Sequence, residues 1–221
     1  MTFPFAAAPP PGHPPGDVPP RFRWLPIRAL GPRQRPRILS HLLALDASDR
    51  HLRFGYAAGD TQIAHYVDQL DFERDEVFGV YSRRLELLAM AHLAYLGRDL
   101  SRPTRAEFGV SVLPHLRGHG VGARLFERAC LHARNRSIDT LVVHALTENR
   151  AMLAIARNAG AQLAHEGADS TAVLRLPPED LGTQLSELVA DQAAEIDYGL
   201  KVQARRLDRW WHALLNRAPS R

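Results

Sequence analysis

The chain has 221 residues, of which 45% are hydrophobic, so it is long enough for one folded domain with additional segments. No apolar run approaches the ~18 residues of a membrane-spanning helix, and no basic patch followed by an apolar core opens the chain. We therefore expect neither a membrane span nor a secretion signal. The single cysteine, Cys130, excludes an internal disulfide framework and favours the reducing cytoplasm.

The net charge of +4 is concentrated at the two ends of the chain. Residues 1–37 hold six Arg and one Asp, and residues 201–221 hold one Lys, five Arg and one Asp. The segment 38–182 carries 16 Arg against 18 acidic residues and is nearly neutral. Since a nucleic-acid-binding domain concentrates basic residues on its recognition elements, we expect no nucleic acid as partner.

Residues 1–21 are rich in proline and lack a periodic apolar pattern, which is typical of a disordered tail. Beyond them, apolar residues recur at helix or strand spacing. In chain order we predict a strand at Phe22–Arg28, a helix over residues 39–45, a turn of helix from a Ser48 cap to Phe54, a helix over residues 63–70 capped by Asp60 or Thr61, and a strand at Glu76–Tyr81. Residues 85–96 are rich in Leu, Ala and Met, so propensity alone favours a helix there.

The second half of the chain shows a clearer pattern. In chain order it predicts a strand over 107–112, a helix over 120–134, a strand over 140–146, a helix from Asn149 to Gly160, and a hairpin of residues 161–166 and 171–176. The first three form a β-α-β unit with an expected right-handed crossover. The apolar face of its helix consists of Val121, Leu125, Phe126, Ala129, Cys130 and Ala133.

Residues 177–221 begin with two prolines and then predict a long amphipathic helix. Its stripe, which Gly199 can interrupt, consists of Leu185, Val189, Gln192, Ile196, Leu200, Gln203, Leu207, Trp210 and Leu214. Three uses of this stripe are open: packing on the domain, contact between the two copies of a homodimer, and binding at a membrane surface.

The most informative segment is the turn Arg117-Gly118-His119-Gly120-Val121-Gly122, between the predicted strand and helix. Glycines allow a sharp turn, and a helix N-terminus adds unpaired N–H donors, so the segment predicts a pyrophosphate site. A Walker loop is excluded because Ala123-Arg124 follows Gly122 where Lys-Ser/Thr is required. The dinucleotide fingerprint fails because the glycines run at spacing two and no acid closes the next strand. A glycine-rich turn without a ligand stays open.

This turn resembles the cofactor loop of the GNAT superfamily of acyl-CoA-dependent N-acyltransferases, whose signature is Arg/Gln-x-x-Gly-x-Gly/Ala. The resemblance spans residues 22–176 and implies an α/β fold. That fold is a mixed, mostly antiparallel sheet with splayed parallel central strands, flanked by helices, to which the C-terminal amphipathic helix is added. The resemblance also places the third strand within residues 85–96, antiparallel to the strand before it.

The resemblance implies acetyl-CoA as co-substrate. The pyrophosphate would contact the main-chain N–H groups of Gly118, His119, Gly120, Val121, Gly122 and Ala123, with Arg117 adding positive charge. The pantetheine arm would pair with the backbone of Val110, Ser111 and Val112. The N–H of Val112 would then donate to the oxyanion. Asn149 is either a helix cap alone or both a cap and a cofactor ligand.

Glu107 is the candidate general base, because it is the only carboxylate on the strand before the loop, where many GNAT members keep a catalytic Glu. The alternative is an exposed strand-end acid or a partner of Arg105, and His92 or His144 could serve as base instead. Many members also carry, seven positions after the cofactor Asn, a Tyr that protonates the leaving thiolate, but position 156 is alanine here. The eleven histidines form no HExxH or Cys/His cluster, so we expect no metal.

The sequence therefore predicts acetyl transfer from acetyl-CoA to a primary amine, such as a protein lysine, a polyamine or another small amine. Arg50 and Arg53 could meet an acidic acceptor or could be solvated. Two alternatives stay open because position 156 lacks Tyr. One is a non-catalytic acyl-CoA sensor that signals through the C-terminal helix, and the other is a scaffold with a vestigial loop.

Overall fold

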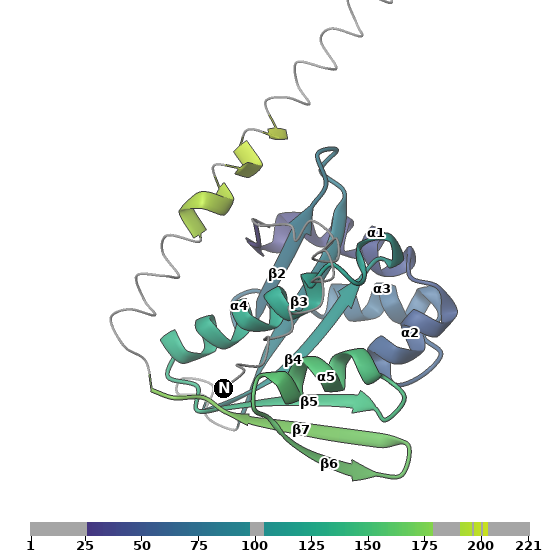
Figure 1. The fold of residues 1–221 in the computed structure, drawn as a ribbon. Coiled ribbons are helices and arrows are strands. Elements are labelled where there is room, and N and C mark those ends of the chain that lie inside the picture. Colours follow the sequence, from purple (N-terminus) through teal and green to yellow (C-terminus); the bar gives the residue numbers. More distant parts are fainter. Residues whose placement is uncertain (1–25, 98–103, 179–190, 196, 200, 203–221) are drawn as a thin grey trace, which may run out of the picture.

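A computed structural model describes residues 26–97, 104–178, 191–195, 197–199 and 201–202. Its strands form one seven-stranded sheet in the order β1-β2-β3-β4-β5-β7-β6 (Figure 1). The strands are β1 (Arg28–Leu30), β2 (Glu76–Tyr81), β3 (Leu87–Leu96), β4 (Arg105–Val112), β5 (Thr140–Leu146), β6 (Gln162–Glu166) and β7 (Asp169–Arg175). Every neighbouring pair is antiparallel except β4 and β5, which are parallel. The predicted mixed α/β fold is confirmed.

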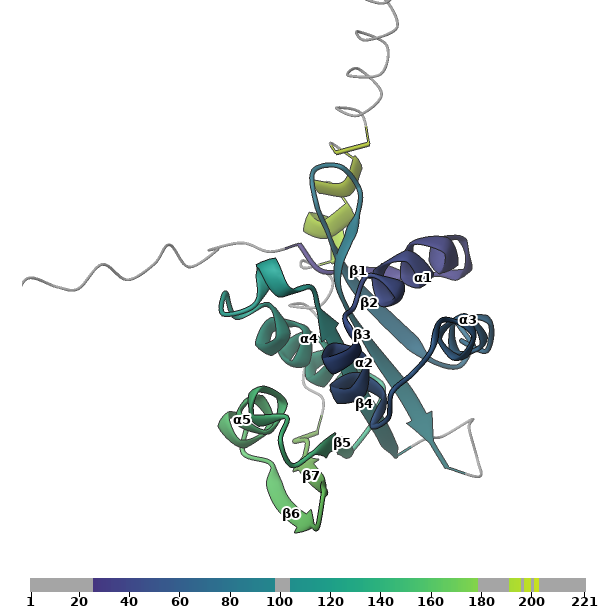
Figure 2. The same ribbon diagram turned by 90° about the vertical axis from the view of Figure 1, so that its right-hand side faces the viewer.

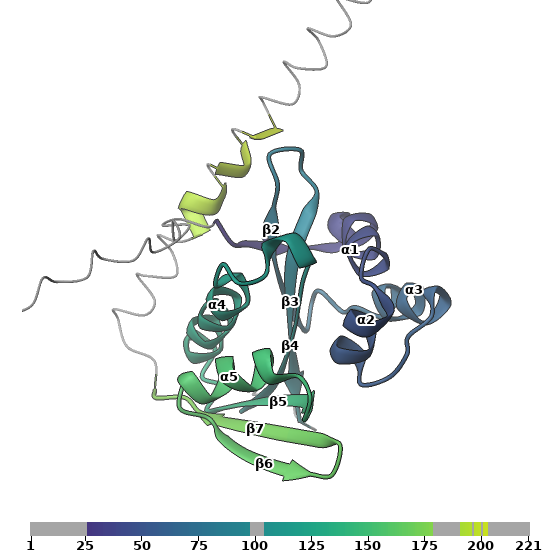
Figure 3. The same cartoon turned by 45° about the vertical axis from the view of Figure 1, so that its right-hand side comes forward.

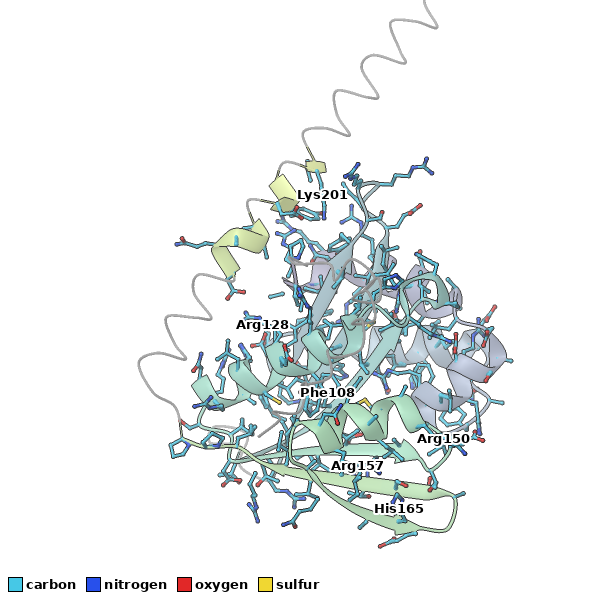
Figure 4. The ribbon with its side chains drawn as sticks, viewed as in Figure 1. Phe108, Arg128, Arg150, Arg157, His165 and Lys201 are labelled. Carbon is cyan, nitrogen blue, oxygen red and sulfur yellow. The ribbon has the colours of Figure 1, made fainter. Side chains whose placement is uncertain are left out.

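Helices cover both faces of the sheet. They are η1 (Pro32–Gln34), α1 (Arg35–Leu43), α2 (Ala47–Phe54), α3 (Asp60–Asp68), η2 (Pro114–Leu116), α4 (Val121–Asn135) and α5 (Arg150–Asn158). Figure 3 shows α1, α2 and α3 on one side of the sheet and α4 on the other. Alternating side chains of the central strands point to opposite faces and form a hydrophobic core on each face. One core is formed with α4 and α5, and the other with α1 and α3. At the centre of the first core, Phe108 of β4 meets Phe126 of α4 edge to face, with ring centroids 5.0 Å apart (Figure 4).

The third strand is the element for which local propensity was misleading. Residues 87–96 pair with β2 on one side and β4 on the other, so they form a strand as the resemblance implied. Leu85, which the prediction included, instead has φ of 60° in the turn before the strand. A strand bonded on both edges and buried on both faces takes Leu, Ala and Met as readily as Val, because packing outweighs propensity there.

The first strand and two helix caps were predicted wrongly. The strand predicted at Phe22–Arg28 begins only at Arg28, and Phe22 lies outside the described residues. Helix α2 is capped by Asp46, whose carboxylate accepts from the N–H of Asp49, and not by Ser48. Helix α3 begins after Gly59, whose N–H donates to the Gln62 side chain at 2.8 Å. A side chain bonded back to the cap residue can thus replace a capping hydroxyl or carboxylate at the cap itself.

The two parallel strands separate within the sheet. They pair only where Arg105, Ala106 and Glu107 face Thr140, Leu141 and Val142. Beyond Glu107, β4 continues to Val112 and β5 continues to Leu146, but the two strands no longer pair with each other. Helix α2 contacts both strands (Figure 2), and the start of α4 follows the end of β4. The predicted splay of the central strands therefore lies beside the glycine-rich turn.

The described part of the C-terminal segment is helical and packs on the domain. Residues 191–195, 197–199 and 201–202 are helical, so the chain stays helical at Gly199. Asp191 pairs with Arg128 of α4, and Lys201 donates to the carbonyl of Tyr81 at 3.1 Å (Figure 4). Gln192, the only member of the predicted stripe among the described residues, is exposed. The buried residue of this described part is Ala194, at 2% exposure.

Some predictions remain untested. The proline-rich tail, most of the predicted C-terminal helix and its dimer contact lie outside the described residues or are not addressed by them. None of the described helices has both the length and the apolar character needed to cross a bilayer.

Candidate active site

A cavity of about 660 Å³ lies where β4 and β5 separate. Its walls come from the last turn of α2, the second half of β4, the glycine-rich turn, the end of β5 and the first turns of α4 and α5. Of the twelve predicted site residues, eleven line it: Glu107, Val110, Ser111, Val112, Arg117, Gly118, Gly120, Val121, Gly122, Ala123 and Asn149. Only His119 is outside the lining.

The glycine-rich turn is shaped by two residues in the left-handed region. Gly118 has φ of 75° and Gly120 has φ of 76°, and α4 begins directly afterwards at Val121. The first intrahelical bond runs from the N–H of Arg124 to the carbonyl of Gly120, so the N–H groups before it have no partner within the helix. A Cβ at Gly122 would lie 3.2 Å from Cδ1 of Ile155 on α5, closer than an ordinary van der Waals contact. This is the donor-rich helix start that an anion requires.

Arg117 is engaged within the protein. Its guanidinium pairs with Asp49 of α2 and donates to the carbonyl of Val112 at 3.2 Å. It therefore ties the turn to α2 and to the end of β4, and its charge is shared with a carboxylate. His119 forms a hydrogen bond from Nδ1 to the carbonyl of Arg117 at 2.8 Å and is exposed. The side chain of His119 thus belongs to the outer surface of the turn.

The backbone of β4 alternates between its two neighbours. The N–H of Leu113 donates to the carbonyl of Leu88 in β3 at 3.0 Å. The carbonyl of Thr104, in contrast, accepts from the N–H of Thr140 in β5. In an antiparallel ladder this parity holds along the strand. The N–H groups of Val110 and Val112 therefore point to the side where β5 has moved away. The N–H group of Ser111 points to β3. The backbone of Ser111 was therefore wrongly predicted to pair with pantetheine.

Ser111 instead faces the helices through its side chain. Its hydroxyl donates to Nε2 of the buried His41 at 2.8 Å, and His41 Nδ1–H donates to the carbonyl of Leu87 at 3.0 Å. Burial lowers the pKa of His41 from 6.5 to about 4, so the ring is neutral near pH 7. This pair anchors α1 to the floor of the cavity.

Glu107 is half-buried on the cavity wall, on the sheet face that carries α2. Among the described residues it has no ion-pair partner, and in particular none in Arg105. His144 also lines the cavity and shares a hydrogen bond with Thr171 at 3.2 Å. His92 does not line it, because it is held between Asp75 and Tyr66. Of the alternatives to Glu107, only His144 faces the same space.

The family of the chain follows from comparison with known proteins. Residues 45–161, just over half of the chain, match the model of the acetyltransferase (GNAT) family. The chain belongs to the GNAT acetyltransferase family. The predicted resemblance is therefore confirmed, and the matched residues include every wall of the cavity except Asp169.

Solved structures share this GNAT fold. The GNAT domain of PAT from S. lividans has a TM-score of 0.59 and 18% identity, over 68% of this chain and 89% of that one. A GNAT-family acetyltransferase from Streptococcus pneumoniae has a TM-score of 0.55 and 11% identity, over 70% and 100%. A cAMP-binding acyltransferase from Mycobacterium smegmatis has a TM-score of 0.51 and 19% identity, but this chain covers only 53% of it. At such identities the likeness shows the fold alone.

Asn149 is a helix cap in this GNAT domain. Its side-chain oxygen accepts from the N–H of Met152 at 3.1 Å, and its amide donates to Leu52 of α2 at 3.4 Å. Ala156, seven residues on, is completely buried in the core. Alanine carries no ionisable proton, so this position supplies no general acid.

Helix α2 contributes residues to the GNAT site, of which the sequence had indicated only Arg53, as a residue that could meet an acidic acceptor. Asp49, Leu52, Arg53 and Phe54 all line the cavity. Arg50 is not among them, because its guanidinium binds the carbonyls of Leu43, Leu45 and Ala58 and the carboxylate of Asp60. The sequence left Arg53 open between contact with an acceptor and a solvated surface, and tertiary packing places it on the cavity wall. Within the described residues, no group of three His, Cys, Asp or Glu side chains could hold a metal.

Proposed function

We propose that this GNAT-family protein transfers an acetyl group from acetyl-CoA to a primary amine. The observation that carries the proposal is the cavity at the splayed strands, where N–H groups of a helix start and of β4 face the same space as the carboxylate of Glu107. Amides of the turn would hold the pyrophosphate, and Val110 and Val112 would hold the pantetheine arm. Asn149 would act as a cap that also borders the cofactor, and Cys130 favours a cytoplasmic location.

The chemistry assigns one task to each group. Glu107 takes a proton from the acceptor ammonium, directly or through water, and the amine nitrogen then forms a bond to the thioester carbon. The N–H of Val112 donates to the oxygen on which negative charge develops. The carbon–sulfur bond breaks, the thiolate leaves, and the second proton of the amine nitrogen passes to solvent. Its pKa of ~8.5 allows departure without the Tyr that other members provide, at some cost in rate.

Two measurements test the proposal. Calorimetry should detect acetyl-CoA binding, and a thiol-release assay with a panel of amines should detect turnover. Failure to bind acetyl-CoA at millimolar concentration would refute the proposal and favour a scaffold, since ligand at 100 times its Kd stabilises by ~2.7 kcal/mol and would be visible in thermal unfolding.

A second function is favoured by Ala156. Without a side-chain acid, the cavity could bind acyl-CoA and report it through the C-terminal segment, which contacts α4 at Asp191. Binding of CoA without turnover of any amine would support this sensor. Acetylation of one amine at a rate above the uncatalysed reaction would exclude it.

A further inference from the structure

Arg53 lies on the cavity wall at the level of β4. A Cβ built on Gly109 would be 2.8 Å from Cζ and from both terminal nitrogens of the Arg53 guanidinium. The guanidinium therefore rests directly on the strand, in space that any side chain at position 109 would fill. Gly109 lies two residues after Glu107, so the two side-chain positions share one face of β4, ~7 Å apart along the strand.

A line of hydrogen-bonded polar groups that ends at the buried Asp75 orients Arg53. Its Nη2 donates to the hydroxyl of Tyr66 at 3.0 Å. Tyr66 must then donate its own proton to Nδ1 of His92 at 2.9 Å, and His92 Nε2–H donates to Asp75 at 3.2 Å. Asp75 is 4% exposed and also accepts from Arg74. Because each member has its donor role set by the next, the hydroxyl of Tyr66 on α3 is left as an acceptor for the guanidinium.

The charge of Arg53 is not neutralised locally. Among the described residues it has no ion-pair partner, and its Nε is buried without a hydrogen bond. Glu107 lines the same cavity, but the two side chains form no ion pair with each other. Unlike Arg117, which has Asp49, Arg53 presents a fixed cation to the cavity beside a separate carboxylate.

We propose that Arg53 binds a carboxylate of the acceptor, and that the acceptor is a small amine carrying that carboxylate, as amino acids do. The inference rests on the proposed acetyl transfer. A guanidinium matches a carboxylate with two parallel hydrogen bonds, while Glu107 faces the amine. A polyamine would place a second cation against Arg53, which costs free energy in a partly enclosed site.

Matched acceptors test this directly. Thiol release would be measured with the common α-amino acids, their methyl esters and their decarboxylated amines, using the wild type, Arg53→Gln, Arg53→Lys and the control Arg157→Gln. Arg157 is exposed on α5, outside the cavity (Figure 4). We expect the wild type to prefer the free acid. Arg53→Gln should lower kcat/KM for the acid by ~10–100-fold, as for loss of a charged hydrogen bond.

The ester separates recognition from structural damage. In Arg53→Gln the kcat/KM for the ester should stay within about three-fold of the wild type. For the acid, the kcat/KM of Arg53→Lys should lie between those of the wild type and Arg53→Gln. Arg157→Gln should match the wild type with both acceptors. An equal loss for acid and ester, or no wild-type preference for the acid, overturns the inference. So does turnover only of amines that lack a carboxylate, in which case acetyl transfer still stands. Absence of acetyl-CoA binding, measured separately by calorimetry, removes the proposed function itself.

Discussion

Glu107 is the residue whose chemical role can be tested most sharply. We expect Glu107→Gln to keep acetyl-CoA affinity within a few-fold, because it leaves the amides of the turn in place, and to lower turnover by ~100-fold or more through loss of the general base. Calorimetry and thiol release measure the two quantities. The matched variant His144→Gln changes the histidine that lines the same cavity and was the alternative base. A larger loss in His144→Gln than in Glu107→Gln would transfer the role of base to His144.

His41 predicts a pH dependence of stability. Burial lowers its pKa from 6.5 in the unfolded chain to about 4, so the folded state resists protonation. The free energy of unfolding linked to this group is at its maximum above pH 6.5. It falls as the pH is lowered toward 4, by on the order of 3 kcal/mol in total. Urea unfolding between pH 7.5 and 4.5 should show this loss. His41→Gln should lack that part of the slope, and an identical pH profile in the variant would contradict the assignment.

At the scale of elements, the start of α4 depends on a left-handed residue. Gly120→Ala places a Cβ at φ of 76°, which costs ~1–2 kcal/mol and rotates the N–H groups that would hold the pyrophosphate. We expect acetyl-CoA affinity to fall at least ~10-fold. The control Gly167→Ala, at φ of 64° in the β6–β7 turn, should lose similar stability but keep its affinity. Equal affinity in both variants would show that the turn does not bind the cofactor.

Other elements show where local sequence and tertiary context diverge. The apolar period of α4 and the Asn149 cap of α5 were predictable, because both are set by residues three or four positions apart. The third strand was not, because its Leu and Ala residues gain more from packing between β2 and β4 than from helical propensity. Helix α2 lies between these cases: its existence was predicted, and its position over β4 was not.

At the scale of the whole molecule, the C-terminal segment joins the domain through ion pairs. Arg128 on α4 is only 7% exposed and forms an ion pair with Asp191. A second ion pair joins Arg28 to Glu195 at 2.5 Å. We expect Asp191→Asn to lower the free energy of unfolding by about 1 kcal/mol, because the Asp191 side chain is partly solvated. Urea unfolding measures this change, and the exposed Glu166→Gln serves as control. A change in molecular mass by light scattering, with stability unaltered, would instead place this contact between two copies.

The sequence by itself determined the glycine-rich turn, the candidate base and the order of most elements, because turns, caps and periodicity depend on neighbours along the chain. Only the tertiary structure decided that Ser111 turns its backbone to β3, that Arg117 is paired with Asp49, and that Arg53 rests on Gly109. Those contacts join segments tens of residues apart. Their geometry depends on how the sheet splays and where α2 packs, which no local pattern encodes.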